Sequence, residues 1–339
     1  MRAGSFFASV LLAGASALAL ASPAAAEQEL HVLHAGGQWG DAITKCVEED
    51  MAKTMGIKVI PESPGGLAKL RGIVESGTIT HTAFDMETSE LVRARAMGLI
   101  QELDWAKINP EPIFPEAQLP DAFGSNYYST IMAFRSDVPA VDNWVDFFDT
   151  VKFPGKRALP DYPGFLLTFA AMGDGVPVDQ LFPLDLDRAF KTLDRVKDDT
   201  IYWQAGSQPP QLLQDNEAQY AISWSGRVVG KENITVSFNQ GMLDLSYFVI
   251  PKGADPKEVE AAYVWFREQT KADKAGCIMQ YVSYPGPVYG IEKLVPADKV
   301  AEMPTYEPNR KVQWLQNAEW WVENNDEVEK RWQEFKLAQ

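Results

Sequence analysis

The chain has 339 residues, of which 46% are hydrophobic and 23% are charged, and its formal net charge is −16 at pH 7. These fractions are those of an ordinary globular protein and exclude fibrous, collagen-like and largely disordered chains. The negative net charge argues against binding to nucleic acid, which requires a basic face, and the length favours two lobes over a single core.

The first 26 residues have the features of a secretory signal sequence. Arg2 precedes an apolar run over residues 6–21, and small residues then end in Ala24-Ala25-Ala26, an A-x-A cleavage pattern before Glu27. A membrane anchor is the weaker alternative, because the run is rich in Ala and Gly and leads directly into that pattern. No later stretch is apolar over the ~20 residues that a membrane helix needs. We therefore expect residues 1–26 to be a signal peptide and the mature protein to be soluble and periplasmic.

The next segment alternates strand patterns with helix patterns. Short apolar runs predict strands, and apolar residues at helical spacing that end in glycine predict helices. The predicted strands span residues 29–35, 57–63 and 81–87, and the predicted helices span residues 41–56, 67–77 and 88–98. Alternation of this kind indicates an α/β fold with a parallel sheet covered by helices.

The rest of the chain continues with the same kinds of element after a loop rich in proline and acids at residues 109–123. A long strand is predicted at residues 126–137 and further strands at 201–206, 219–225 and 244–256. Helices are predicted at residues 165–173, 186–199, 209–217 and 256–269, and an amphipathic helix from residue 311 onward. The tryptophans of this last helix are expected to pack against the fold.

Motifs of known enzyme classes are absent from the sequence. It contains no G-x-S-x-G, H-E-x-x-H, G-x-G-x-x-G or phosphate-binding G-x-x-x-x-G-K-[ST]. The three histidines, His31, His34 and His81, do not have zinc-site spacing. Tyr127 and Tyr128 resemble the paired tyrosines of ferric-ion sites, but adjacent strand residues point to opposite faces, so packing is favoured. We expect a protein that is not an enzyme and that has neither cofactor nor metal.

Aromatic and polar residues gather where the predicted strands end. In open α/β sheets, ligands bind at the carboxyl ends of the strands. Each residue alone is a weak signal, and most are better explained as loop or core residues, so the repeated placement is the stronger signal. The candidate ligand-binding residues are Gln38, Trp39, Asp85, Glu87, Asp161, Trp203, Ser207, Trp224, Arg227, Ser246 and Tyr284.

Several segments, taken in order, resemble the extracytoplasmic solute-binding proteins of ABC importers, in the spermidine/putrescine-binding branch. They are LHAGGQWGDAI, HTAFDMETSELVRARAMGLIQELD, RALPDYPG, WQAGSQPPQLLQDNEAQYAISWSGR, YFVIPKGA and YVSYPGP. The resemblance covers essentially the whole mature chain. It implies a two-lobed periplasmic binding protein fold of type II, in which each lobe is a mainly parallel sheet flanked by helices. The solute would be held in the cleft between the lobes.

The resemblance also implies lobe boundaries and partners. Lobe I would comprise residues 27–130 and 243–300, and lobe II residues 131–242 and 301–339. The closed form of a monomer would dock on an ABC transporter permease in the inner membrane. Cys46 and Cys277 would then share lobe I, so that a disulfide becomes possible in an oxidising compartment, and two buried free thiols are the open alternative.

The sequence has a basic residue, Arg227, where the polyamine-binding pattern has an acidic one. Polyamine binders have a motif similar to W-x-G-D at the position where this chain has W-S-G-R, which ends at Arg227. They also tend to have an acidic residue in the strand where this chain has LSYF, residues 245–248. Opposite charges ~4 Å apart gain about 4 kcal/mol at an effective dielectric of about 20, and like charges lose as much. An arginine would therefore disfavour a diamine, whereas it can form a bidentate pair with a carboxylate.

We therefore predict that Trp224 forms a flat wall and that Arg227 anchors the carboxylate of a small organic solute. The alternative for Arg227 is a side chain that points to solvent or pairs with a structural acid. Asp85, Glu87 or Asp161 would meet an amine if the ligand is an amino-carboxylate, although helix capping competes as an explanation for each acid. The alternative functions are a polyamine-binding protein, whose acids come from other loops, and a ferric-ion-binding relative.

Overall fold

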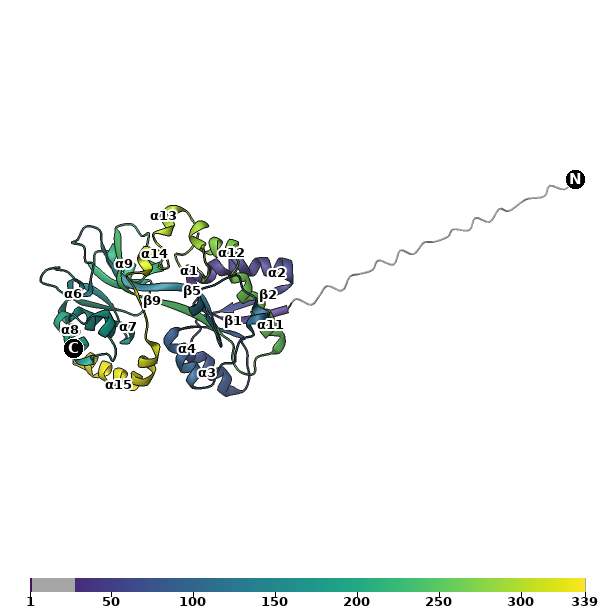
Figure 1. Ribbon diagram of the computed structural model, residues 1–339, viewed down its shortest axis with the longest axis horizontal. Helices are drawn as coiled ribbons and strands as arrows, with labels where there is room; N and C mark the ends of the chain where they lie inside the picture. The colour runs from purple at the N-terminus through teal and green to yellow at the C-terminus, as the bar shows by residue number, and fades with distance from the viewer. Residues whose placement is uncertain (2–27, 339) are drawn as a thin grey trace.

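The protein is described by a computed structural model that places residue 1 and residues 28–338 (Figure 1). The predicted signal peptide, residues 1–26, lies outside the described residues except for Met1. The described chain folds into a central sheet flanked by helices, so the predicted α/β class is confirmed. Across this part of the chain, no helix is both long enough and apolar enough to cross a membrane.

The described strands join one mixed, ten-stranded sheet. They are β1 (Gln28–Leu33), β2 (Ile57–Glu62), β3 (Ala83–Glu87), β4 (Gln118–Leu119), β5 (Ala122–Arg135), β6 (Arg157–Pro160), β7 (Thr200–Trp203), β8 (Tyr220–Trp224), β9 (Ile234–Val249) and β10 (Trp314–Leu315). The main path runs β2-β1-β3-β9-β5-β8-β6-β7. Parallel pairs form both ends of the path, whereas the long central strands β5 and β9 are antiparallel to each other.

The predicted helices occur in order along the chain, together with short helices that the sequence did not predict, and the last predicted helix begins at Ala318, after strand β10, not at residue 311. The helices are α1 (Gly37–Ile43), α2 (Glu49–Met55), α3 (Leu67–Ser76), α4 (Thr88–Ala96), α5 (Trp105–Ile108), α6 (Trp144–Phe147), α7 (Gly164–Gly173), α8 (Leu186–Val196), α9 (Gln208–Gln214), α10 (Ser225–Val228), α11 (Pro256–Gln269), α12 (Ala272–Ile278), α13 (Ala297–Val300), α14 (Glu307–Arg310) and α15 (Ala318–Leu337). A π-helical turn, Thr44–Glu48, joins α1 to α2, so the predicted helix at residues 41–56 begins earlier and contains this turn.

Strand β9 differs most from its prediction. The sequence predicts a strand that begins at residue 244, but β9 begins at Ile234. The hydrogen-bonded ladder between β5 and β9 shifts register between Thr130 and Met132 of β5. Gln240 and Gly241 lie opposite this shift on β9, and Gln240 has a positive φ of 57°. A bulge of this kind interrupts the alternation of apolar and polar residues, and the interruption hid the first half of the strand.

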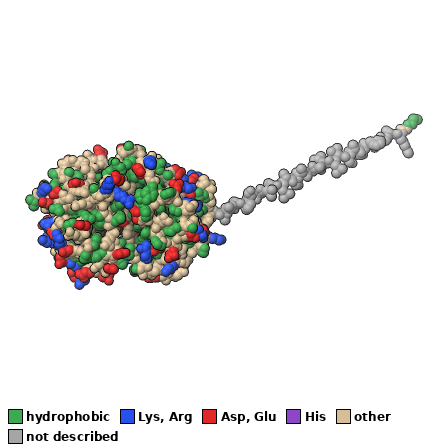
Figure 2. Space-filling view, in the orientation of Figure 1, with side chains coloured by type: hydrophobic (Ala, Val, Ile, Leu, Met, Phe, Trp, Pro, Cys, Tyr) green, Lys and Arg blue, Asp and Glu red, His purple; other side chains and the backbone are tan. Residues whose placement is uncertain are grey.

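The buried apolar side chains form two separate clusters. One cluster takes its members from residues 30–127 and 243–303, and the other from residues 131–242 and 321–332. The clusters part within β5 and β9, which are the strands that run from one to the other. Acidic and basic side chains are interspersed over the face shown in Figure 2.

Cys46 and Cys277 form a disulfide, which settles the question that the sequence left open. Cys46 lies in the π-helical turn after α1, and Cys277 lies in α12. Their Cα atoms are 5.8 Å apart, although 231 residues separate them in the chain. The bond therefore joins the beginning of the first cluster to its later part.

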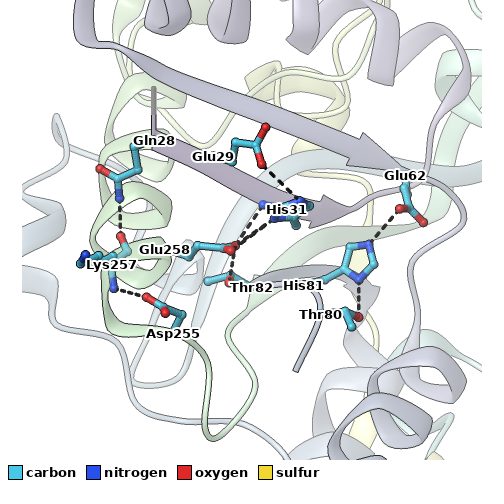
Figure 3. A network of polar contacts seen from close by, with 10 residues as sticks. All are labelled: Gln28, Glu29, His31, Glu62, Thr80, His81, Thr82, Asp255, Lys257 and Glu258. Carbon is cyan, nitrogen blue, oxygen red and sulfur yellow. Dashed lines mark hydrogen bonds and ion pairs between the residues drawn. The ribbon is translucent and has the colours of Figure 1, made fainter. Parts of the chain in front are cut away.

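His31 and His81 belong to a polar network around β1, the first strand along the chain (Figure 3). His31 on β1 contacts Glu258 of α11 at 3.3 Å, and Thr82 donates a hydrogen bond of 2.9 Å to the same carboxylate. His81 contacts Glu62 at 3.3 Å. These contacts tie β1 to α11 and the end of β2 to the segment before β3. Over residues 28–338, no group of three or more histidine, cysteine, aspartate and glutamate residues is arranged to hold a metal ion.

Candidate functional site

A cavity of about 360 Å³ lies where the two clusters meet. Most of the residues predicted to bind ligand line it, namely Trp39, Asp85, Glu87, Trp224, Arg227, Ser246 and Tyr284. Trp224 and Arg227 come from β8 and α10, while the other residues come from elements of the first cluster. Cavities of this size accept small organic molecules.

Aromatic rings form the apolar wall of the cavity. The ring of Trp224 packs edge to face against Trp203, with their centroids 5.7 Å apart. Two glycines allow this packing: a Cβ atom on Gly206 would lie 2.5 Å from the Trp224 ring, and one on Gly226 would lie 2.3 Å from the Tyr284 ring. The rings are therefore held against backbone, which fixes the shape of the wall.

Trp39 forms a second aromatic surface. Its ring is stacked on Phe248 at 6.1 Å between centroids and meets His34 edge to face at 5.6 Å. His34 also accepts a hydrogen bond from the backbone N–H of Gly36, and burial lowers the pKa of its imidazole. The loop between β1 and α1 is thereby fixed around Trp39.

Arg227 lies in the first turn after β8, on α10. Its guanidinium pairs with no carboxylate of residues 28–338, and its buried Nε has no hydrogen-bond partner. Burial raises the pKa of the neighbouring Tyr284 hydroxyl, and the charge and hydrogen bond of Arg227 act against this rise. A buried donor without a partner is costly, so this guanidinium is available to an anionic ligand.

Four carboxyl groups form a cluster at the cavity: Asp85, Glu87 and Glu90 line it, and Asp244 is close enough to act electrostatically on Glu87. Asp85 and Glu87 are two residues apart on β3, and side chains at this spacing project from the same face of a strand. Glu87 forms no ion pair with any residue of the described chain.

The other three carboxylates are held by hydrogen bonds from the protein. Asp85 accepts from the backbone N–H of Ala35 at 2.9 Å and from the hydroxyl of Ser246. Asp244 accepts from the hydroxyls of Thr88 and, at 2.9 Å, Tyr128. Glu90 accepts from the backbone N–H of Leu67 at 3.1 Å. Glu87 is the N-cap of α4 and forms a capping box with Glu90, so helix capping accounts for part of its placement. It is also the exposed member of the cluster and lines the cavity, where a ligand can reach it.

Burial raises the pKa of Asp85 and Asp244, and burial together with the neighbouring acids raises the pKa of Glu87. Desolvation in the cleft, followed by the negative charges of the other three carboxyl groups, raises the pKa of Glu87 to about 8. Desolvation raises the pKa of Asp85 and of Asp244 to about 6, and their hydrogen bonds oppose this rise. Solvent reaches Glu87 through the cleft, so a bound cation can replace the water there and stabilise the ionised form.

Replacing Glu87 by glutamine is expected to stabilise the ligand-free protein at alkaline pH. Because folding raises the pKa of Glu87 from its ordinary 4.5 to about 8, the folded chain binds more protons between these pH values, and its stability falls as pH rises through them. The Glu87→Gln variant has no carboxyl group to ionise at this position, so it does not lose stability in this way as pH rises. Urea unfolding across the pH range measures the difference, with Glu75→Gln on the exposed face of α3 as the control. Equal pH profiles for wild type and Glu87→Gln would contradict the assignment.

Four of the residues predicted to bind ligand lie outside the lining of the cavity. Gln38 and Ser207 are exposed at the starts of α1 and α9. The carboxylate of Asp161 pairs with Lys336 of α15 at 2.8 Å. Trp203 is buried behind Trp224 and supports it. Direct contacts of these residues with ligand stay a prediction.

Some lining residues were not among the candidates: Asn126 and Tyr128 of β5 and Glu90 of α4. Tyr127 and Tyr128 point to opposite faces, since the Tyr127 hydroxyl donates to Glu116 and the Tyr128 hydroxyl donates to Asp244. Asn126 and Tyr128 lie within a long strand, not at its end. The strand-end rule therefore could not find them, and the only sequence signal was the polar Asn126 beside an aromatic pair.

Comparison with known proteins adds a family relationship. The family described as bacterial extracellular solute-binding protein matches residues 45–307 of the chain. The chain is also 28% identical, over 329 residues, to a gamma-aminobutyric acid-binding protein of Pseudomonas aeruginosa, and the match covers 93% of each sequence.

Solved structures show the same architecture. An ABC transporter substrate-binding protein from Bradyrhizobium japonicum is 30% identical, with a TM-score of 0.83 over 91% of this chain and 99% of that one. The PBP AgtB from A. tumefaciens R10, solved in complex with agropinic acid, is 28% identical, with a TM-score of 0.78 over 91% of this chain and 98% of that one. The predicted two-lobed fold is confirmed. The relationship supports the broader family, not the spermidine/putrescine branch that the sequence resembled.

Proposed function

Because the chain belongs to the bacterial extracellular solute-binding protein family, we propose that it captures a small amino-carboxylate between its lobes and delivers it to an ABC permease. It would act in the periplasm as a monomer. Closure of the predicted lobes, residues 27–130 with 243–300 and residues 131–242 with 301–339, would enclose the solute.

One observation carries this proposal: the same cavity holds a guanidinium and a carboxylate that are both without an ion-pair partner among the described residues. Arg227 offers a bidentate site for the carboxylate of the ligand. Glu87, with the three neighbouring acids behind it, offers a site for the ammonium group. The rings of Trp224 and Tyr284 would cover the carbon chain between these two ends. Gamma-aminobutyrate, which the Pseudomonas relative is named for, has this arrangement of charges.

The acid cluster also favours a second candidate, a polyamine. Four carboxyl groups could hold a diamine more tightly than an amino acid if Arg227 turned away from the ligand. The ferric-ion alternative has less support, because the hydroxyls of Tyr127 and Tyr128 are already hydrogen-bonded to Glu116 and Asp244. Titration calorimetry with gamma-aminobutyrate, butyrate and putrescine separates these functions. Binding of putrescine alone would favour the polyamine function.

Binding of gamma-aminobutyrate at pH 7 is expected to release up to about one proton per ligand. Glu87, whose pKa is about 8, is mostly protonated at this pH, and an ammonium group beside it stabilises the ionised form and lowers its pKa. The release should vanish above pH 9, where the carboxyl group is already ionised. Calorimetry in buffers of different ionisation enthalpy measures it, and Glu87→Gln should abolish it. Proton uptake, or the same release in the variant, would contradict the ammonium site.

A further inference from the structure

A contact between the two clusters lies beside Arg227. Tyr284 is a member of the first cluster, and Gly226 lies on α10, two residues before Val228 of the second cluster. A Cβ atom on Gly226 would lie 2.3 Å from Cε1, 2.5 Å from Cζ and 2.8 Å from Cδ1 of the Tyr284 ring, which are the three atoms nearest to it outside α10. Carbon atoms in ordinary contact are about 3.5 to 4.0 Å apart. The absence of a side chain at Gly226 therefore lets the ring of one cluster approach the backbone of the other.

The Tyr284 side of this contact is fixed to the first cluster. The carbonyl of Pro285 accepts a hydrogen bond of 2.8 Å from the backbone N–H of Tyr127, and the carbonyl of Pro287 accepts one of 2.9 Å from the backbone N–H of Phe114. Tyr127 is fully buried in the first cluster, and Tyr284 itself is 8% exposed. Movement of the ring away from Gly226 would disturb this packing.

The Gly226 side is fixed to α10 and the second cluster. The hydroxyl of Ser225 accepts a hydrogen bond of 3.1 Å from the backbone N–H of Ser129, and Val228 at the end of α10 is fully buried. Gly226 does not have a positive φ, so alanine can adopt its backbone conformation. The approach of Tyr284, and not the backbone, therefore requires glycine at this position.

The hydroxyl group of Tyr284 adds a polar part to the contact. It accepts a hydrogen bond from the guanidinium of Arg227, the residue after Gly226. A guanidinium has five N–H donors in one plane, so a bond to Tyr284 leaves donors for a carboxylate and restricts how the plane can turn. The group that orients Arg227 thus comes from the other cluster.

We propose that Gly226 and Tyr284 form a closing contact of the cleft, and that Tyr284 is a positioning residue that orients Arg227 for the carboxylate of the solute when the halves come together. Rotation of the halves away from each other would separate the hydroxyl from the guanidinium. The anchor is then complete only in the closed protein, so a carboxylate bound to Arg227 favours the closed form. The role of Tyr284 rests on the proposed function, whereas the contact at Gly226 concerns closure on any solute.

Gly226→Ala is expected to weaken the binding of gamma-aminobutyrate about 10- to 100-fold, because the added methyl group overlaps the Tyr284 ring in the closed protein. The free energy of unfolding of the ligand-free protein should not fall, since alanine favours helix and the open protein has room for the methyl group. Titration calorimetry and urea unfolding measure the two quantities. Gly72→Ala on α3 is the matched control, because a Cβ atom there meets nothing within 4 Å.

A double-mutant cycle assigns the loss of affinity to the ring. Tyr284→Ala removes the ring, so Gly226→Ala should change the affinity by less than about twofold in this background. Small-angle X-ray scattering supplies the second measurement. At the concentration of gamma-aminobutyrate that saturates the wild type, the radius of gyration of the wild type should decrease, and that of Gly226→Ala should decrease less. Equal affinities and equal radii for the two proteins would overturn the closing contact.

Tyr284→Phe tests the positioning role, because it keeps the ring and removes the hydroxyl. This variant should close as the wild type does in the scattering experiment and bind gamma-aminobutyrate about tenfold more weakly. Its effect and that of Arg227→Lys should be less than additive, since both changes displace the same hydrogen-bond donors. Wild-type affinity in Tyr284→Phe would overturn the positioning role.

The outcomes separate this inference from the function on which it rests. If gamma-aminobutyrate binds to the wild type and Gly226→Ala behaves as the wild type does, the closing contact is wrong and the amino-carboxylate function stands. If putrescine binds and gamma-aminobutyrate does not, the amino-carboxylate function fails, and the affinity and radius of Gly226→Ala with putrescine decide the closing contact by the same criteria. If neither probe binds to the wild type, both proposals fail.

Discussion

Arg227→Ala is expected to weaken the binding of gamma-aminobutyrate by about 2 to 5 kcal/mol, or roughly 30-fold to several thousand-fold. Removal of the guanidinium leaves the carboxylate of the ligand in a closed, poorly hydrated cavity without its partner, and this unpaired charge accounts for much of the loss. Arg227→Lys should lose less, because it keeps the charge but not the bidentate geometry. Titration calorimetry on wild type and both variants measures the effect.

The stability of the ligand-free protein provides the internal check on this result. Since Arg227 pairs with no acid of the described chain, its removal should not lower the free energy of unfolding appreciably. Arg71→Ala, which removes an exposed arginine from α3, is the control and should bind ligand as wild type does. Wild-type affinity in Arg227→Ala would show that the carboxylate of the ligand is held elsewhere. A gain of putrescine binding in Arg227→Asp would agree with the assignment of charges.

The double substitution Cys46→Ala and Cys277→Ala is expected to lower the free energy of unfolding by about 2 to 5 kcal/mol. The disulfide closes a segment of 231 residues, and a closed segment of this length strongly restricts the unfolded chain. Urea unfolding of the oxidised wild type and of the double variant measures the difference.

Reduction of the wild-type disulfide is the matched control for this experiment. The reduced wild type should unfold at nearly the same urea concentration as the double variant, because both lack the bond. Ligand affinity should change little, since neither cysteine lines the cavity between the lobes. An oxidised wild type no more stable than the double variant would contradict a stabilising role for the bond.

Local patterns predicted the fold well where the chain is regular. Strands and helices alternate from β1 to α4, and each is marked by its own periodicity and by a glycine such as Gly56 or Gly77 at the end of a helix. The first half of β9 could not be predicted, because the bulge near Gln240 and Gly241 breaks the alternation of side chains. The disulfide could not be decided either, since it depends on how distant segments pack together.

The candidate site was predictable to the extent that it lies at strand ends. Trp39 follows β1, Glu87 ends β3 and Trp224 ends β8, and all three line the cavity. Asp161 also follows a strand, but its carboxylate is paired with Lys336, which comes from the far end of the chain. No local pattern reveals such a partner. Asn126 and Tyr128 line the cavity from within β5, because this strand crosses from one cluster to the other.

The continuity of β5 and β9 has a mechanical consequence. The halves of the molecule are joined by a hydrogen-bonded ribbon as well as by loops, so opening of the cleft must twist this ribbon. The register shift between Thr130 and Met132 interrupts the ladder where the two clusters part, so we expect the ribbon to yield there. Tyr128, two residues before this shift, and Trp224, which pairs with Thr130, line the cavity. A captured molecule would therefore contact the segment that has to bend, and we expect it to stiffen this segment.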